Sequence, residues 1–214
     1  FGKDPKKAIA ALENGASREE LMEKGSTAAV IDASFDVEPG EIFVIMGLSG
    51  CGKSTLIRMV NGLLPATAGS LEIGGENLFT MSAKQEREVR RRRISMVFQH
   101  FALLPHLTVR ENAAYGLKLQ GKLKSKDRLE KANEWLHTVG LKGWGDKYPH
   151  QLSGGMSQRV MIAMAIACKP KLLIADEPTT ALDVTVQAEI LDLLRRCRDE
   201  FGTAIVLITH VRDE

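Results

Sequence analysis

The chain has few cysteines and no long apolar run. Its 214 residues include three cysteines, Cys51, Cys168 and Cys197, an odd number at wide spacing. This pattern excludes a disulfide framework and a Cys-x-x-Cys metal pair, and it favours a reducing compartment such as the cytosol. The longest apolar stretches, 42–46 and 172–175, are much shorter than the roughly 20 residues that cross a bilayer. We therefore expect a chain that does not itself span a membrane.

An excess of charge of one sign is also missing. The chain has 29 Lys and Arg against 27 Asp and Glu, a formal net charge of +2. Such a balance gives no long-range attraction to nucleic acid or anionic lipid, so we expect no nucleic-acid partner. The basic run 90–93 is interpreted as a solvated helix face. With 44% hydrophobic residues, the chain can bury a substantial core.

Apolar periodicity predicts an α/β fold with a helical lobe. Two short helical patterns, 6–13 and 19–24, come first, and extended runs with a turn at 38–41 follow over 30–45. Strands are expected at 42–46, 70–73, 94–98, 172–175 and 204–208, and helices at 110–119, 126–139, 157–168 and 184–198. The later strands alternate with helices, which is typical of a mostly parallel sheet.

These patterns divide the chain into three regions. We predict an N-terminal helical appendage over 1–25 and a main domain over 26–214, with its core at about 26–99 and 169–214 and a helical subdomain at about 100–168. The sequence begins at Phe1 rather than methionine and ends directly after a strand-like run, where a parallel fold usually continues into a helix. We therefore expect further chain beyond Glu214.

A phosphate-binding loop follows the strand at 42–46. The sequence G-L-S-G-C-G-K-S over 47–54 has the Walker A spacing and lies between a predicted strand and a predicted helix. Its glycines let backbone N–H groups surround phosphate oxygens, and the helix start adds positive potential. Lys53 is expected to reach the β- and γ-phosphates, and Ser54 to hold Mg²⁺. The predicted nucleotide contacts are Gly47, Leu48, Ser49, Gly50, Cys51, Gly52, Lys53, Ser54 and Thr55.

Two carboxylates follow the buried run 172–175. Asp176 and Glu177 lie where a parallel strand ends, at the edge where open α/β sheets bind ligands. Asp176 is expected to hold Mg²⁺ through water. Glu177 could orient and deprotonate a water in line with the γ-phosphate, which favours an ATPase over a phosphotransferase.

Two further polar residues end predicted strands. The amide of Gln99 could contact both the metal and the attacking water, and the imidazole of His210 could donate to the γ-phosphate. Each residue taken singly would be an ordinary surface amide or histidine. Their position beside the other motifs makes them candidate catalytic residues, with Gln99 also a candidate metal ligand.

The segment L-S-G-G over 152–155 precedes a predicted helix. Ser153, Gly154 and Gly155 offer a hydroxyl, flexible backbone amides and a helix N-terminus to an anion. By itself this is a helix cap. The chain already has a complete phosphate loop, so a second helix start that could bind an anion needs an explanation. It is explained if this helix start contacts a γ-phosphate held by another subunit.

Together these motifs resemble the ATP-binding subunit of ABC transporters, from about residue 29 to His210, and L-S-G-G separates this family from other phosphate-loop ATPases. The resemblance implies a P-loop NTPase fold with an antiparallel β portion and an inserted helical subdomain. It also implies ATP and Mg²⁺, and a head-to-tail homodimer in which Ser153 and Gly155 of one subunit meet ATP held by Lys53 of the other. Residues 181–183, including Asp183, would lie at the dimer seam. A transmembrane permease would dock near Gln99 at the cytoplasmic face of the membrane, served by a solute-binding protein.

The two halves of the chain resemble different importers. The segments F-G-K-D-P at 1–5, I-F-V-I-M-G-L-S-G at 42–50 and F-Q-H-F-A-L-L-P-H at 98–106 are similar to glycine betaine and proline betaine importer ATPases. The segments at 148–156 and 175–188 are closer to dipeptide and oligopeptide importer ATPases. The two-helix appendage favours the betaine type. A soluble ABC-type ATPase without a membrane partner and a fragment that only binds nucleotide are the alternatives.

Three positions depart from the family pattern. Met156 stands where the signature usually has Gln, and Val211 stands where an acidic residue often follows the histidine. Ala28 and Ala29 occupy the zone where many members stack an aromatic side chain on adenine. Phe1 is then a candidate for the adenine contact.

Overall fold

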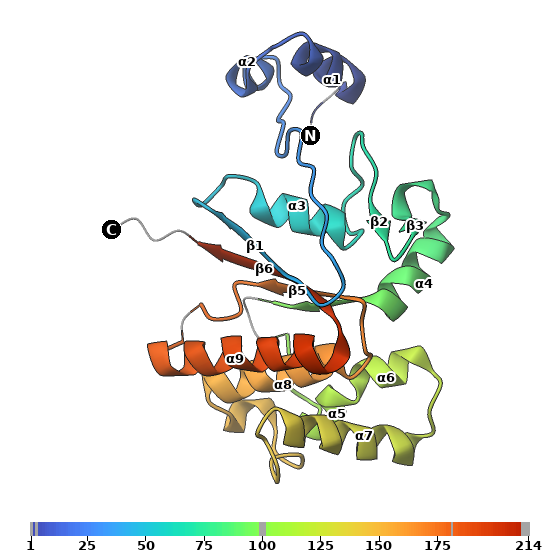
Figure 1. Ribbon diagram of the computed structural model, residues 1–214, viewed down its shortest axis with the longest axis vertical. Coiled ribbons are helices and arrows are strands. Elements are labelled where there is room, and N and C mark those ends of the chain that lie inside the picture. Colours follow the sequence, from blue (N-terminus) through green and yellow to red (C-terminus); the bar gives the residue numbers. More distant parts are fainter. Residues whose placement is uncertain (1, 3, 99–101, 181, 211–214) are drawn as a thin grey trace.

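A parallel four-stranded sheet forms the centre of the computed structural model, which describes residues 2, 4–98, 102–180 and 182–210. The strands, in spatial order, are β1 (Ile42–Gly47), β6 (Ala204–His210), β5 (Leu172–Asp176) and β4 (Ile94–Val97). Gly47 pairs with His210 and Asp176 with Ile208, so the carboxyl ends of three strands meet at one edge (Figure 1). The predicted fold class is confirmed.

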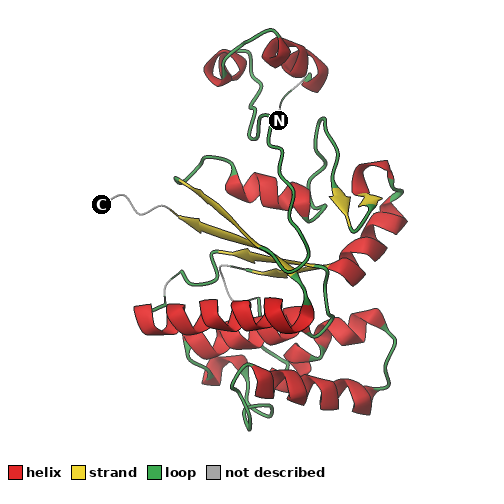
Figure 2. Ribbon diagram, viewed as in Figure 1, coloured by secondary structure: helices red, strands yellow, loops and turns green. Residues whose placement is uncertain are grey.

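Helices cover both faces of this sheet (Figure 2). One face packs against α8 (Gly154–Ile166) and α9 (Val184–Phe201), and the other against α3 (Lys53–Val60) and α4 (Ala83–Arg93). Neighbouring strand residues point to opposite faces: Leu173 joins the first core cluster, while Leu172 and Ile174 join the second. Burial on both faces explains the continuous apolar runs that predicted these strands.

A small antiparallel ribbon lies beside α3 and α4. It consists of β2 (Glu72–Ile73) and β3 (Glu76–Asn77), and a single 3₁₀ turn, η1 (Leu78–Thr80), follows it. Extended runs were expected before β1, and the structure forms no strand within 30–41, a segment that it describes in full. Residues 31–36 are all exposed. The segment therefore buries too little apolar surface to stabilise pairing with another strand. The segment is instead held by side chains, with Phe35 stacked on Phe43 at 4.8 Å between ring centroids.

The helical lobe lies on the far side of α8 and α9 from the sheet (Figure 1). It contains α5 (Val109–Ala113), α6 (Tyr115–Gln120), α7 (Ser125–Thr138) and the 3₁₀ turn η2 (Pro149–Gln151). Asn112 is fully buried here, and its amide bonds the backbone of Leu104, Leu107 and Thr108. These bonds hold the loop before α5.

Two helices at the N-terminus, α1 (Pro5–Glu13) and α2 (Arg18–Glu23), stand at the opposite end of the molecule from the lobe (Figure 1). Leu21 is the buried side chain of α2, and Arg18 donates to the carbonyl oxygen of Ala29 at 3.3 Å. The predicted division into an appendage, a core and a helical subdomain stays a prediction.

The basic run at the end of α4 does more than face solvent. Arg90 donates to the carbonyl oxygen of Gly62 at 2.7 Å, and Arg93 donates to those of Ile73 and Gly74, both at 2.9 Å. These arginines therefore fix the loop after α3 and the turn between β2 and β3.

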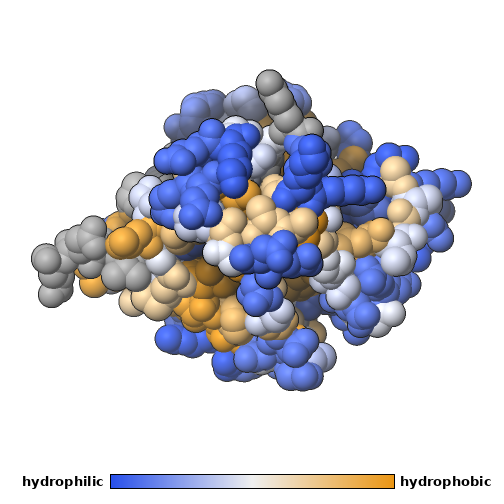
Figure 3. Space-filling model, turned by 90° about the horizontal axis from the view of Figure 1, so that it is seen from above, coloured by the Kyte–Doolittle hydropathy of each residue, from blue (hydrophilic) through white to orange (hydrophobic). Residues whose placement is uncertain are grey.

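Viewed from above, polar and apolar side chains share the surface (Figure 3). Of the described helices, none has the length and hydropathy needed to cross a membrane.

Candidate functional site

The phosphate loop joins the end of β1 to the start of α3. Gly50 and Gly52 have φ values of +78° and +102°, in the left-handed region that favours glycine. A Cβ atom on Gly52 would also lie 2.3 Å from the carbonyl oxygen of Ala29. Gly52 gives α3 no side-chain cap, so the first-turn N–H groups have no partner within the helix. The loop therefore presents positive potential and backbone donors to an anion.

The side chain of Lys53 is folded into this loop. Its ammonium donates to the carbonyl oxygens of Gly47 at 2.5 Å and Leu48 at 2.8 Å, and the residue is buried. The same Nζ atom lies 3.4 Å from Nδ1 of His210 and 3.8 Å from Sγ of Cys51. The cation is thus held at the loop where the sequence predicts phosphate binding.

Asp176 is the last residue of β5 and is half-buried. Burial raises the pKa of its carboxyl group, the charge of Glu177 raises it further, and Arg58, His210 and Lys53 act in the opposite direction. The charged carboxylate is therefore costly to keep at this position, and a bound cation would offset that cost. This environment fits the metal role predicted for Asp176.

Glu177 occupies a strained backbone position directly after the strand. Its φ is +49°, unusual for a residue with a side chain, and its N–H donates to the carbonyl oxygen of Ile208 at 3.1 Å. The carboxylate is buried and makes two contacts: Oε1 contacts Nε2 of His210, and Oε2 accepts from the hydroxyl of Thr180 at 3.0 Å.

His210 connects the two halves of the site. It ends β6 beside Gly47, and its imidazole contacts Lys53 through Nδ1 and Glu177 through Nε2. The structure thus brings Lys53, Asp176, Glu177 and His210, predicted from three separate segments, to one edge of the sheet.

The remaining predicted contacts fall in two groups. Ser54 and Thr55 lie in the first turn of α3, and Leu48, Ser49 and Cys51 are exposed on the loop. The Ser54 hydroxyl and the Asp176 carboxylate are oxygen donors of the kind that Mg²⁺ prefers. No cluster of three or more His, Cys, Asp or Glu suited to a metal occurs in the part of the chain that the structure describes. Gln99, Phe1, Ala181 and Val211 lie outside that part, and the roles assigned to them stay predictions.

The L-S-G-G segment forms the start of α8, which packs on the opposite face of the sheet from α3. Ser153 caps the helix, and its Oγ accepts from the N–H of Met156 at 3.3 Å. Gly154 and Gly155 form the first turn, and Asp183 caps the neighbouring α9 through the N–H of Val186 at 3.0 Å. Among the described residues, no hydrogen bond or ion pair joins Ser153 or Asp183 to Lys53. One chain therefore carries two separate helix starts of the kind that binds anions.

Gly155 packs tightly against α9. A Cβ atom on Gly155 would lie 2.7 Å from Cγ1 of Val186. We predict that Gly155→Ala lowers the free energy of unfolding by about 1–3 kcal/mol through overpacking, measured by chemical denaturation. Val186→Ala removes the clashing methyl groups, so the double variant should be more stable than the two single losses added together. Simple additivity would contradict a direct contact.

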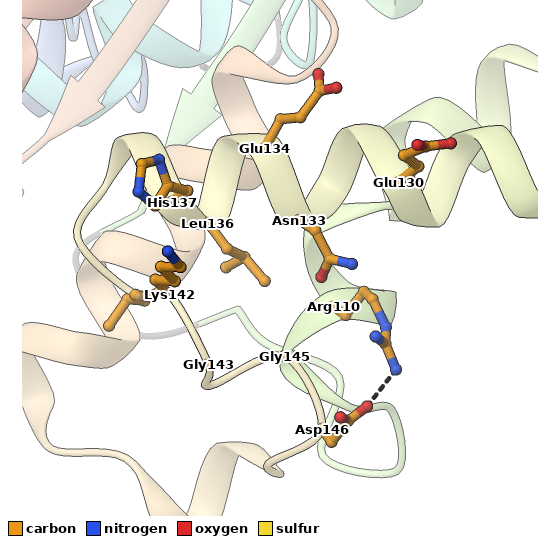
Figure 4. Close-up of a pocket in the computed structure, with 11 residues that line it drawn as sticks. Arg110, Glu130, Asn133, Glu134, Leu136, His137, Lys142, Gly143, Gly145 and Asp146 are labelled. Atoms are coloured by element: carbon orange, nitrogen blue, oxygen red, sulfur yellow. Dashed lines mark hydrogen bonds and ion pairs between the residues drawn. The ribbon is translucent and has the colours of Figure 1, made fainter.

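Sequence reasoning missed two features. Thr180 is three residues after Glu177 in the run E-P-T-T, and a hydroxyl at that spacing on a turn was the available signal. The second is an open pocket of about 630 Å³ in the helical lobe, between α5, α7 and the loop over 141–146 (Figure 4). Arg110 and Asp146 form an ion pair at its wall, and none of the predicted site residues that the structure describes lines it.

A parallel sheet with a phosphate loop after β1 and paired carboxylates after β5 defines a P-loop nucleotide-binding protein. Comparison with known proteins narrows the class, because the sequence model of the family described as ABC transporter matches residues 30–180. The chain belongs to the ABC transporter family.

Several relatives carry betaine transport in their names. The glycine betaine transport ATP-binding protein OpuAA of Bacillus subtilis is 51% identical over all of this chain and 51% of its own length. The glycine betaine/proline betaine transport system ATP-binding protein ProV of Escherichia coli is 46% identical over all of this chain and 54% of its own length. The chain thus spans about half the length of these relatives. The resemblance to betaine importer ATPases is confirmed.

A solved structure supports the fold assignment. The ATP-binding cassette MJ0796, in a dimeric post-hydrolysis state bound to ADP and Pi, superposes with a TM-score of 0.77 at 35% identity. The match covers 86% of this chain and 80% of that one.

Proposed function

We propose that this chain is the ATP-hydrolysing subunit of an ABC importer for glycine betaine, proline betaine or a related osmoprotectant. The observation that carries the proposal is the contact chain from Lys53 through His210 to Glu177 at the phosphate loop. The contacts join an ammonium, an imidazole and a carboxylate, which supports a site with a cation for phosphate, a hydrogen-bond donor and a base. The names of the betaine relatives support the solute class.

Each residue has a role in this proposal. Lys53 and the loop amides bind the β- and γ-phosphates, and Ser54, Asp176 and Gln99 hold Mg²⁺, which supplies charge neutralisation when bound. Glu177 accepts a proton from the attacking water, and His210 donates a hydrogen bond to the γ-phosphate. To bind the phosphates, Lys53 must leave the carbonyl oxygens of Gly47 and Leu48. Nucleotide binding should therefore rearrange the loop.

The assembly is also part of the proposal. Ser153, Gly154 and Gly155 would contact the γ-phosphate held by a second copy, with Asp183 at the seam of a head-to-tail homodimer. The dimer would act at the cytoplasmic face of a membrane, on permease subunits that receive their solute from a solute-binding protein. The separation of the α8 start from Lys53 supports a two-chain site, and the dimeric state of the MJ0796 cassette is consistent with it.

Phosphate release from ATP tests the proposal directly. We expect release that depends on Mg²⁺ and is lost with a chelator, and that falls at least about 100-fold in Lys53→Ala. Lys131→Ala, on the exposed face of α7, is the matched control and should keep full turnover. Release by Lys53→Ala at the wild-type rate would contradict the assignment.

Copurification with a permease distinguishes the transport function from its alternatives. Turnover stimulated by membrane subunits together with betaine supports the proposal, and stimulation by a peptide would favour a dipeptide or oligopeptide importer. Turnover that membrane subunits do not stimulate would favour a soluble ABC-type ATPase, and binding without turnover would favour a fragment that only binds nucleotide.

A further inference from the structure

The carboxylate of Glu177 has two contacts that differ in kind. One is the contact of Oε1 with Nε2 of the His210 imidazole, and the other is the hydrogen bond that the Thr180 hydroxyl donates to Oε2 at 3.0 Å. A backbone bond closes the same turn, because the N–H of Thr180 donates to the carbonyl oxygen of Glu177 at 3.2 Å. Thr180 thus holds Glu177 through both its main chain and its side chain.

The His210 contact is lost in the proposed reaction if the imidazole turns Nε2 from Glu177 to the γ-phosphate. His210 already lies between Lys53 and Glu177, and the proposed function requires its imidazole to donate to the γ-phosphate. A nitrogen that turns to the phosphate no longer fixes Oε1. Without a second contact, the carboxylate would then be free to rotate about its last torsion, which has broad minima in glutamate.

We propose that Thr180 is the positioning residue for Glu177. Its hydroxyl fixes Oε2 throughout the cycle and leaves Oε1 facing the attacking water once His210 has moved to the phosphate. Thr180 acts through Glu177 and touches no reacting atom, and the inference rests on the proposed function of Glu177 as the base. The strained φ of +49° at Glu177 indicates that the turn is fixed at the cost of backbone strain, as expected for a preorganised catalytic group.

A purely structural role for the hydroxyl is disfavoured by burial. Thr180 is exposed, so its substitution opens no cavity in the core, whereas Glu177 is buried. Loss of the hydroxyl therefore changes the orientation of the carboxylate and leaves the packing of the sheet intact.

The test is ATP turnover by the purified protein with Thr180→Val, which keeps the shape and removes the hydroxyl. We expect kcat to fall about 10-fold with KM for ATP unchanged within about two-fold, because the group acts on the chemical step. Thr180→Ser should recover most of the loss. Thr138→Val on α7, which removes a hydroxyl bonded to the carbonyl oxygen of Glu134, is the matched control and should keep wild-type kcat.

A double-variant cycle separates positioning from any other effect. Adding Thr180→Val to Glu177→Gln should lower single-turnover rates no further, because the substituted side chain no longer takes a proton. Wild-type kcat in Thr180→Val, or an equal further loss in the Glu177→Gln background, would overturn the proposal while leaving the base assignment intact. Full turnover in Glu177→Gln alone would instead remove the base assignment, and the positioning role with it.

Discussion

Glu177→Gln is expected to lower steady-state ATP turnover by about 100-fold or more while ATP binding is retained. The amide has nearly the shape of the carboxylate and can still accept from Thr180 and contact His210, so the turn should survive. It cannot accept a proton from water. The variant therefore removes the chemical step and leaves the phosphate contacts of Lys53 in place.

A second observable follows from the same variant. If the γ-phosphate joins two chains, blocking hydrolysis should trap an ATP-bound dimer, detected as a shift in size-exclusion chromatography that appears with ATP and not with ADP. Glu200→Gln, exposed near the end of α9, is the matched control. Undiminished turnover in Glu177→Gln would sink the assignment of Glu177 as the base, whatever the dimer does.

The sheet and its functional edge were predictable because their signals are local. The apolar run 172–175 is buried on both faces in β5, so the position of Asp176 at its end follows from strand length alone. The spacing from Gly47 to Ser54 likewise fixes a strand, a loop and a helix start. Fold and phosphate site thus follow from short stretches of sequence.

What could not be predicted depends on contacts between distant segments. The contact of Lys53 with His210 joins residues 157 positions apart, and no local pattern indicates that their side chains meet. The roles of Arg90 and Arg93 were misjudged for the same reason, because their partners are carbonyl oxygens on other elements. The segment before β1 differs again, since a sequence pattern that predicts an extended chain does not specify a partner strand.

The helix starts at Lys53 and Ser153 lead to a prediction about a mixture of two inactive variants. Ser153→Asp keeps a good helix cap but places a negative charge where the γ-phosphate of the partner would lie, so this variant should lose turnover at least about 100-fold. Lys53→Ala should be equally inactive through loss of phosphate binding. Ser153→Asn, which caps without charge, is the matched control and should retain much more activity than Ser153→Asp.

Mixing the two inactive variants should restore turnover. A head-to-tail heterodimer has one site with both lesions and one site that combines an intact Lys53 from one chain with an intact Ser153 from the other. Free exchange of subunits gives about half heterodimers, each with one complete site of two, so about a quarter of the wild-type rate is expected if the sites act independently. If Lys53 and Ser153 served the same ATP within one chain, the mixture would stay inactive. Recovered phosphate release is therefore the measurement that assigns these two residues to opposite subunits.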